Sequence, residues 1–161
     1  RFITYAPKDS RVVAYEINPY AAFICQKTYP HAIVYKQAFE SLFFEGNRHL
    51  KGNFTIAPFQ LIIGNPPYGE FKGKYAGMGE RKYTIASEYD QYFITRGLDV
   101  LSPGGLLVYL ISSYFLNSKK AYQKVKKKIA EKAELIYALR LPNGSVDYTD
   151  VGTDIIIFKK R

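Results

Sequence analysis

Short apolar runs alternate with amphipathic stretches along the whole chain. The runs typical of buried strands lie at residues 11–17, 32–35, 59–64, 106–112, 135–141 and 154–159. The stretches with helical periodicity lie at residues 18–28, 88–101 and 119–133, with a brief turn or helix at 39–44. This alternation predicts an α/β fold with a mostly parallel twisted sheet. No helix separates the last two strands, so the final strand is predicted to be antiparallel.

Local punctuation supports these boundaries. Asn18 and Pro19 suit the cap and first turn of a helix, and the sequence Pro103-Gly104-Gly105 should stop the helix that precedes it. Residues 45–58 form a polar connection. Residues 69–87 contain four glycines and no clear period. A connection of that length is usually functional or mobile.

Composition narrows the class of protein. A chain of 161 residues with 47% hydrophobic and 23% charged residues fits one globular domain. Its apolar runs are too short to span a bilayer, so we expect no membrane partner. Cys25 is the only cysteine, which excludes an internal disulfide and fits a cytoplasmic location. Cys25 and the two histidines, His31 and His49, do not have the spacing of a metal-binding motif, so we expect no metal. The net charge of +9 is compatible with a polyanionic partner.

The sharpest motif is Asn65-Pro66-Pro67-Tyr68, directly after the apolar run at 59–64. Two consecutive prolines stiffen the turn and remove two backbone donors. The Asn65 side-chain oxygen and the Pro66 carbonyl are then two acceptors that could meet the two N–H groups of one amine. Tyr68 offers a flat face for stacking a base. An exocyclic base amine is a poor nucleophile, and such acceptors would stabilise positive charge developing on its nitrogen.

The segment from Ile62 to Gly69 resembles the catalytic motif of S-adenosylmethionine-dependent amino-methyltransferases, in particular N6-adenine DNA methyltransferases. The resemblance implies a Rossmann-like fold, S-adenosyl-L-methionine as cofactor and DNA as partner, with the target adenine flipped out of the duplex. It implies catalytic roles for Asn65, Pro66, Pro67 and Tyr68. It places cofactor contacts at Glu16, which would bind the ribose hydroxyls, and at Ile17, Gln37, Ala38, Phe39 and Asn65.

The same resemblance extends over nearly the whole chain, with three departures. Tyr92-Phe93 and residues 101–106 are similar to the helix and strand after the catalytic loop, and residues 141–155 to the last hairpin. The family's first strand and Gly-rich cofactor loop have no counterpart. Ala38 stands near the usual Asp, leaving Gln37 or Glu40 as substitutes. Val146 and Tyr148 are both candidates for a second aromatic or apolar contact with the flipped base.

These departures suggest that residues 1–161 are an N-terminally truncated catalytic domain without a target recognition domain. The expected remainder is an upstream Gly-rich motif with target recognition or helicase segments, as in large methylases of restriction systems or mobile elements. The parent is then a site-specific adenine methyltransferase, and the fragment alone is expected to be inactive.

Basic residues beside the motif suggest how DNA could be contacted. They are Lys72, Lys74, Arg81 and Lys82. They form either a DNA-contacting flap or a solvated loop, and their position favours the flap. The lysine-rich helix at 119–133 is more typical of a solvated face.

Two alternative functions remain open from the sequence alone. The same turn serves methyltransferases that act on protein glutamine or on base amines in RNA. A catalytically silent nucleic-acid-binding module of the same fold is the other alternative.

Overall fold

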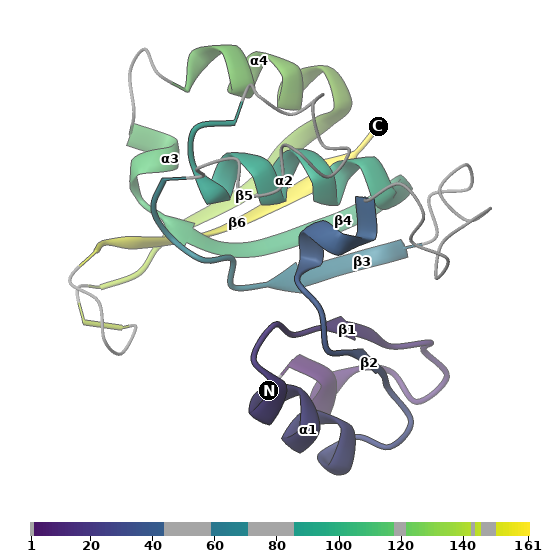
Figure 1. Ribbon diagram of the computed structural model, residues 1–161. Helices are drawn as coiled ribbons and strands as arrows, with labels where there is room; N and C mark the ends of the chain where they lie inside the picture. Colours follow the sequence, from purple (N-terminus) through teal and green to yellow (C-terminus); the bar gives the residue numbers. More distant parts are fainter. Residues whose placement is uncertain (1, 44–58, 71–85, 118–121, 143, 146–150) are drawn as a thin grey trace. The chain divides into compact units, whose positions relative to one another are not determined.

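The computed structural model describes residues 2–43, 59–70, 86–117, 122–142, 144–145 and 151–161. These residues form two compact units, one within residues 1–51 and one within residues 52–161 (Figure 1). Each unit has its own sheet and is described separately.

The first unit is built on a small parallel sheet. It contains η1 (Phe2–Tyr5), β1 (Val13–Tyr15), α1 (Pro19–Thr28), β2 (Ile33–Tyr35) and η2 (Phe39–Phe43). Strand β1 pairs with β2 in parallel, with Ala14 opposite Val34. The side chain of Asn18 accepts hydrogen bonds from the backbone N–H groups of Tyr20 and Ala21, which caps α1 as the sequence predicts.

The second unit contains a four-stranded sheet in the order β3-β4-β6-β5. Its elements are β3 (Phe59–Gly64), α2 (Tyr89–Val100), β4 (Leu101–Ser112), α3 (Tyr114–Asn117), α4 (Gln123–Lys132), β5 (Ala133–Arg140) and β6 (Thr153–Lys160). Strands β3 and β4 are parallel, whereas β6 is antiparallel to both of its neighbours. The predicted antiparallel last strand is therefore confirmed, and it lies between β4 and β5.

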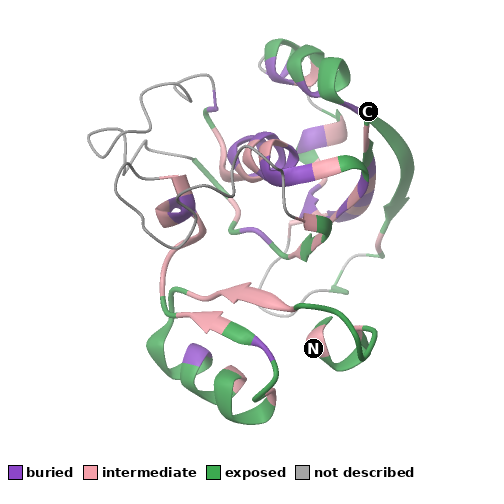
Figure 2. Ribbon diagram, turned by 90° about the vertical axis from the view of Figure 1, so that its right-hand side faces the viewer, coloured by how far each residue is buried: buried purple, intermediate pink, exposed green. Residues whose placement is uncertain are grey.

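Helices α2 and α4 lie on the same face of the four-stranded sheet (Figure 1). The core beneath them includes Ile94 and Leu98 of α2, Val125 and Ile129 of α4, and Ile156 of β6. Figure 2 shows that α4 turns exposed residues outward and buried residues toward the sheet. Its exposed lysines Lys124, Lys127 and Lys128 agree with the expected solvated face.

The predicted boundary that differs most from the structure is the start of β4. Strand β4 begins at Leu101 rather than at residue 106, because the Pro103-Gly104-Gly105 sequence forms an irregularity in the strand instead of a connection before it. A Cβ on Gly105 would lie 2.9 Å from the carbonyl oxygen of Ser102 and 3.0 Å from that of Gln60 in β3, so a side chain here would displace the backbone. The short helix α3 was not predicted.

Candidate active site

The Asn65–Tyr68 turn leaves the carboxyl end of β3, as the sequence indicates. Asn65 is exposed, Pro66 is buried and Tyr68 is half-buried. The Tyr68 hydroxyl donates a hydrogen bond of 3.1 Å to Oδ1 of Asn65. Burial raises the pKa of Tyr68, so its hydroxyl remains a protonated donor at neutral pH. The hydrogen bond orients the Asn65 amide, and the second lone pair on Oδ1 can still accept from another donor.

The far end of the turn is held by the start of α2. Gly69 has a φ of 102°, a conformation that favours glycine. Its carbonyl oxygen accepts a 3.0 Å hydrogen bond from the backbone N–H of Tyr89, and Glu70 forms an antiparallel bridge with Glu88. The motif is therefore fixed at both ends, by β3 on one side and by α2 on the other.

A buried polar cluster, not predicted from the sequence, lies where α2 begins. Asp90 is 4% exposed, and its Oδ1 accepts a 2.6 Å hydrogen bond from the backbone N–H of Gln91. The Gln91 side chain in turn accepts a 3.0 Å hydrogen bond from the backbone N–H of Ser87. Burial, together with the negative charge of Glu88, raises the pKa of Asp90 to about 6. An acidic residue in a first helical turn usually signals only favourable interaction with the helix dipole, so the pattern does not reveal this burial.

In the first unit, the parallel strands β1 and β2 bring two predicted cofactor segments to one edge. Glu16 follows β1 and is half-buried, and its Oε1 accepts a 2.8 Å hydrogen bond from the backbone N–H of Asn18. Ile17 is 65% exposed beside it. The backbone N–H of Glu16 donates to the carbonyl oxygen of Tyr35, so the backbone of Glu16 is held beside the end of β2.

The second cofactor segment follows β2. Gln37, Ala38 and Phe39 are half-buried, and Oε1 of Gln37 accepts a 3.1 Å hydrogen bond from the hydroxyl of Ser41. Glu40 is buried. Of the two substitutes proposed for the missing Asp, Gln37 is therefore the more exposed.

Several predicted contacts lie outside the described residues. They are Lys72, Lys74, Arg81, Lys82, Val146 and Tyr148. Their roles stay predictions.

Comparison with known proteins identifies the family. A profile described as "Eco57I restriction-modification methylase" matches residues 14–145 of this chain. The chain belongs to the Eco57I restriction-modification methylase family. This membership places it among methyltransferases, in agreement with the resemblance carried by the sequence.

Individual relatives are distant and much longer. Defense against restriction protein B of Escherichia phage P1 is 24% identical over 158 residues, which is 96% of this chain and 6% of the phage protein. A modification subunit assigned to a type I restriction enzyme of Vibrio vulnificus YJ016 superposes with a TM-score of 0.75 at 18% identity. That match covers 95% of this chain and 33% of the Vibrio chain.

A protein of Listeria monocytogenes assigned as a class I S-adenosylmethionine-dependent methyltransferase has the same fold. It superposes with a TM-score of 0.70 at 16% identity, covering 94% of this chain and 45% of the Listeria chain. The fold is therefore α/β and methyltransferase-like, with one antiparallel strand in its larger sheet.

Among the described residues, no helix combines the length and apolar character that crossing a bilayer requires. The same residues contain no group of three or more His, Cys, Asp or Glu side chains placed to hold a metal ion.

Proposed function

We propose that this chain is the catalytic part of a methyltransferase that transfers a methyl group from S-adenosylmethionine to the N6 amine of adenine in DNA. The observation that carries the proposal is the turn after β3, where an exposed Asn65 is oriented by the Tyr68 hydroxyl. Family membership supports methyl transfer in a restriction-modification setting, and the turn is what favours an amine as acceptor.

The turn suits an amine because it offers acceptors and no ionisable base. Oδ1 of Asn65 can accept one N–H of the amine, and the carbonyl of Pro66 can accept the other. Both oxygens carry partial negative charge, so they stabilise the positive charge that develops on nitrogen during transfer. The half-buried ring of Tyr68 gives an extruded base a surface for stacking, worth about 1–3 kcal/mol.

The edge formed by β1 and β2 fits the adenosine part of the cofactor. Oε1 of Glu16 is engaged by the backbone of Asn18, so the carboxylate is fixed while Oε2 is left to accept from a ribose hydroxyl. Exposed Ile17 and half-buried Phe39 offer apolar contacts to a purine, and Gln37 offers an amide for its polar edge. When bound, S-adenosylmethionine supplies the electrophilic methyl group.

A transfer assay tests the function directly. The chain, alone and within the full polypeptide that its gene encodes, is incubated with isotope-labelled S-adenosylmethionine and with DNA, RNA or protein. We expect label in DNA with the full polypeptide, recovered as N6-methyladenine after digestion to nucleosides, and none with the chain alone. Label confined to RNA or to protein glutamine would replace DNA as the substrate, and cofactor binding without any transfer would indicate a silent module.

Glu16 provides a separate test of the cofactor site. Glu16→Gln keeps an acceptor for the N–H of Asn18 but removes the charge, and a hydrogen bond to a charged group contributes about 1.5–3 kcal/mol. We expect the dissociation constant for S-adenosylmethionine, measured by calorimetric titration, to rise by about tenfold or more. The control Asp9→Asn removes the same charge from an exposed position of the same unit and should leave the affinity unchanged. Equal affinities for wild type and Glu16→Gln would argue against the site.

A further inference from the structure

A second polar group lies at the carboxyl edge of the four-stranded sheet, outside the residues proposed for catalysis. Arg140 ends β5, Asp154 is the second residue of β6, and Asn117 ends α3. Nε of Arg140 donates to Oδ1 of Asp154, and Nη2 donates to Oδ2 of Asp154 at 3.1 Å and to Oδ1 of Asn117 at 3.4 Å. The contacts with Asp154 are bidentate, and together with Asn117 they fix the orientation of the guanidinium.

Burial differs sharply between the two charged partners. The Asp154 side chain is 1% exposed, whereas the Arg140 side chain is 50% exposed. A buried carboxylate must be paired, and Arg140 satisfies it with Nε and Nη2. Within the described part of the chain, the remaining nitrogen, Nη1, makes no hydrogen bond. The guanidinium therefore keeps two N–H donors while its orientation is already fixed, so little side-chain entropy is lost when those donors bind an anion.

The register of the strands places Arg140 on the same edge as Asn65. Arg140 pairs with Asp154, and Asp154 pairs with Ile111, near the carboxyl end of β4. Neighbouring strands lie about 4.8 Å apart, so three spacings in the order β3-β4-β6-β5 separate Arg140 from β3 by about 14 Å. That separation suits a side chain that contacts the sugar-phosphate backbone of DNA while the target base is held at Asn65.

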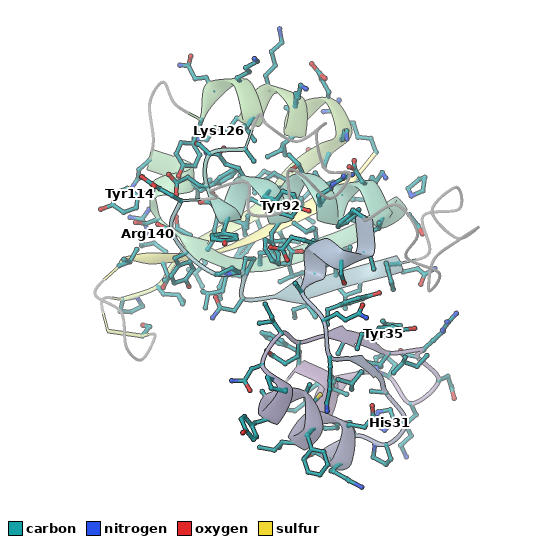
Figure 3. All side chains as sticks on the ribbon, viewed as in Figure 1. His31, Tyr35, Tyr92, Tyr114, Lys126 and Arg140 are labelled. Atoms are coloured by element: carbon teal, nitrogen blue, oxygen red, sulfur yellow. The ribbon has the colours of Figure 1, made fainter. Side chains whose placement is uncertain are left out.

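The surroundings of Arg140 also suit nucleic acid. Tyr114 of α3 is 64% exposed. The ammonium of Lys126, in α4, donates a 3.2 Å hydrogen bond to the carbonyl oxygen of Leu116 in α3. Figure 3 labels Tyr114, Lys126 and Arg140 at the end of the second unit where α3 lies. Two cations and an exposed aromatic ring are therefore tied to one short helix.

We propose that Arg140, oriented by Asp154 and Asn117, binds a backbone phosphate of the DNA strand that carries the target adenine. The proposal rests on the proposed function, because it requires DNA as the substrate. Arg140 then acts as a positioning residue, which fixes the strand while the extruded base enters the site. The sequence signal for it is modest, namely an arginine and an aspartate at the ends of two otherwise apolar strands.

Salt dependence of DNA binding distinguishes a phosphate contact from a structural ion pair. The full polypeptide is titrated with a duplex that contains one mismatched adenine, because such a base is extruded at lower cost than a paired one. Arg140→Gln keeps a donor for Asp154 but removes the charge. We expect the slope of log K against log salt concentration to become shallower by about 1. The control Lys127→Ala removes one exposed positive charge from α4 and should leave the slope unchanged.

A second measurement uses the wild-type protein, so it does not depend on the folding of a variant. Single phosphates near the mismatched adenine are replaced in turn by neutral methylphosphonates. We expect one position at which wild type loses affinity by about fivefold or more, and at which Arg140→Gln loses none. A lowered melting temperature with an unchanged salt slope, or equal slopes for Arg140→Gln and Lys127→Ala, would reduce Arg140 to a structural role. Absence of DNA binding by wild type would overturn the proposed function as well.

Discussion

Asn65→Ala is expected to reduce methyl transfer to DNA by about three orders of magnitude or more while S-adenosylmethionine still binds. Removing a single preorganised group that stabilises developing charge typically costs about 100- to 1,000-fold in rate. Here the alanine also removes the partner of the Tyr68 hydroxyl, so the acceptor and its orientation are lost together. Single-turnover transfer to DNA measures the rate, and calorimetric titration measures cofactor affinity.

Two variants of the neighbouring tyrosine separate charge stabilisation from stacking. Tyr68→Phe keeps the ring and removes only the hydroxyl that orients Asn65, so we expect a loss of about tenfold or less. Tyr68→Ala removes the stacking surface and should raise the concentration of DNA needed for half-maximal rate. Unchanged turnover in Asn65→Ala would refute the assignment of the turn as catalytic.

Asp90→Asn is expected to stabilise the chain at neutral pH. The pKa of Asp90 is raised from 3.8 to about 6 by burial, with a smaller contribution from Glu88. The folded state therefore retains a proton that the unfolded state has already released between these two values. The stabilisation that comes from the raised pKa of Asp90 is fully present below pH 4. It is lost as the pH rises toward 6. Replacement by the neutral amide should add about 2–3 kcal/mol at pH 7.

Chemical denaturation of wild type and Asp90→Asn at pH 4 and pH 7 measures this effect. The stability difference should be large at pH 7 and close to zero at pH 4. Asp99→Asn is a matched control in the same helix, because Asp99 pairs with Arg96 and Lys132 and its removal should give no gain. A difference that does not depend on pH, or a loss of stability in Asp90→Asn at pH 7, would contradict the expected cost of burying this carboxylate.

The elements that could be predicted are those whose signals are local. The Asn18-Pro19 cap and the turn at Asn65 depend on residues next to one another in sequence, and the structure places both where the pattern indicates. The predicted start of β4 was wrong because the sequence Pro103-Gly104-Gly105 is equally typical of the end of a helix and of an irregularity within a strand. Only the neighbouring strand β3 decides between these two outcomes.

The polar groups that depend on tertiary contacts could not be predicted. Asp90 resembles an ordinary acidic residue of a first helical turn until the packing around it is known. The pair of Arg140 and Asp154 depends on the register between β5 and β6, which the sequence does not specify across the intervening loop. The position of β6 between β4 and β5 is likewise a property of the assembled sheet. The absence of a helical pattern between the last two sequence runs indicated only that the final strand is antiparallel.

That position has a consequence for biosynthesis. Among the described strands, β5 hydrogen-bonds only to β6, which is synthesised after it. A nascent chain that has emerged as far as Arg140 therefore has no completed partner for that strand, and the carboxylate that holds Arg140 has not yet been translated. Closure of the larger sheet must wait until residues 153–160 leave the ribosome, so the proposed phosphate contact forms only after β6 has paired with β5.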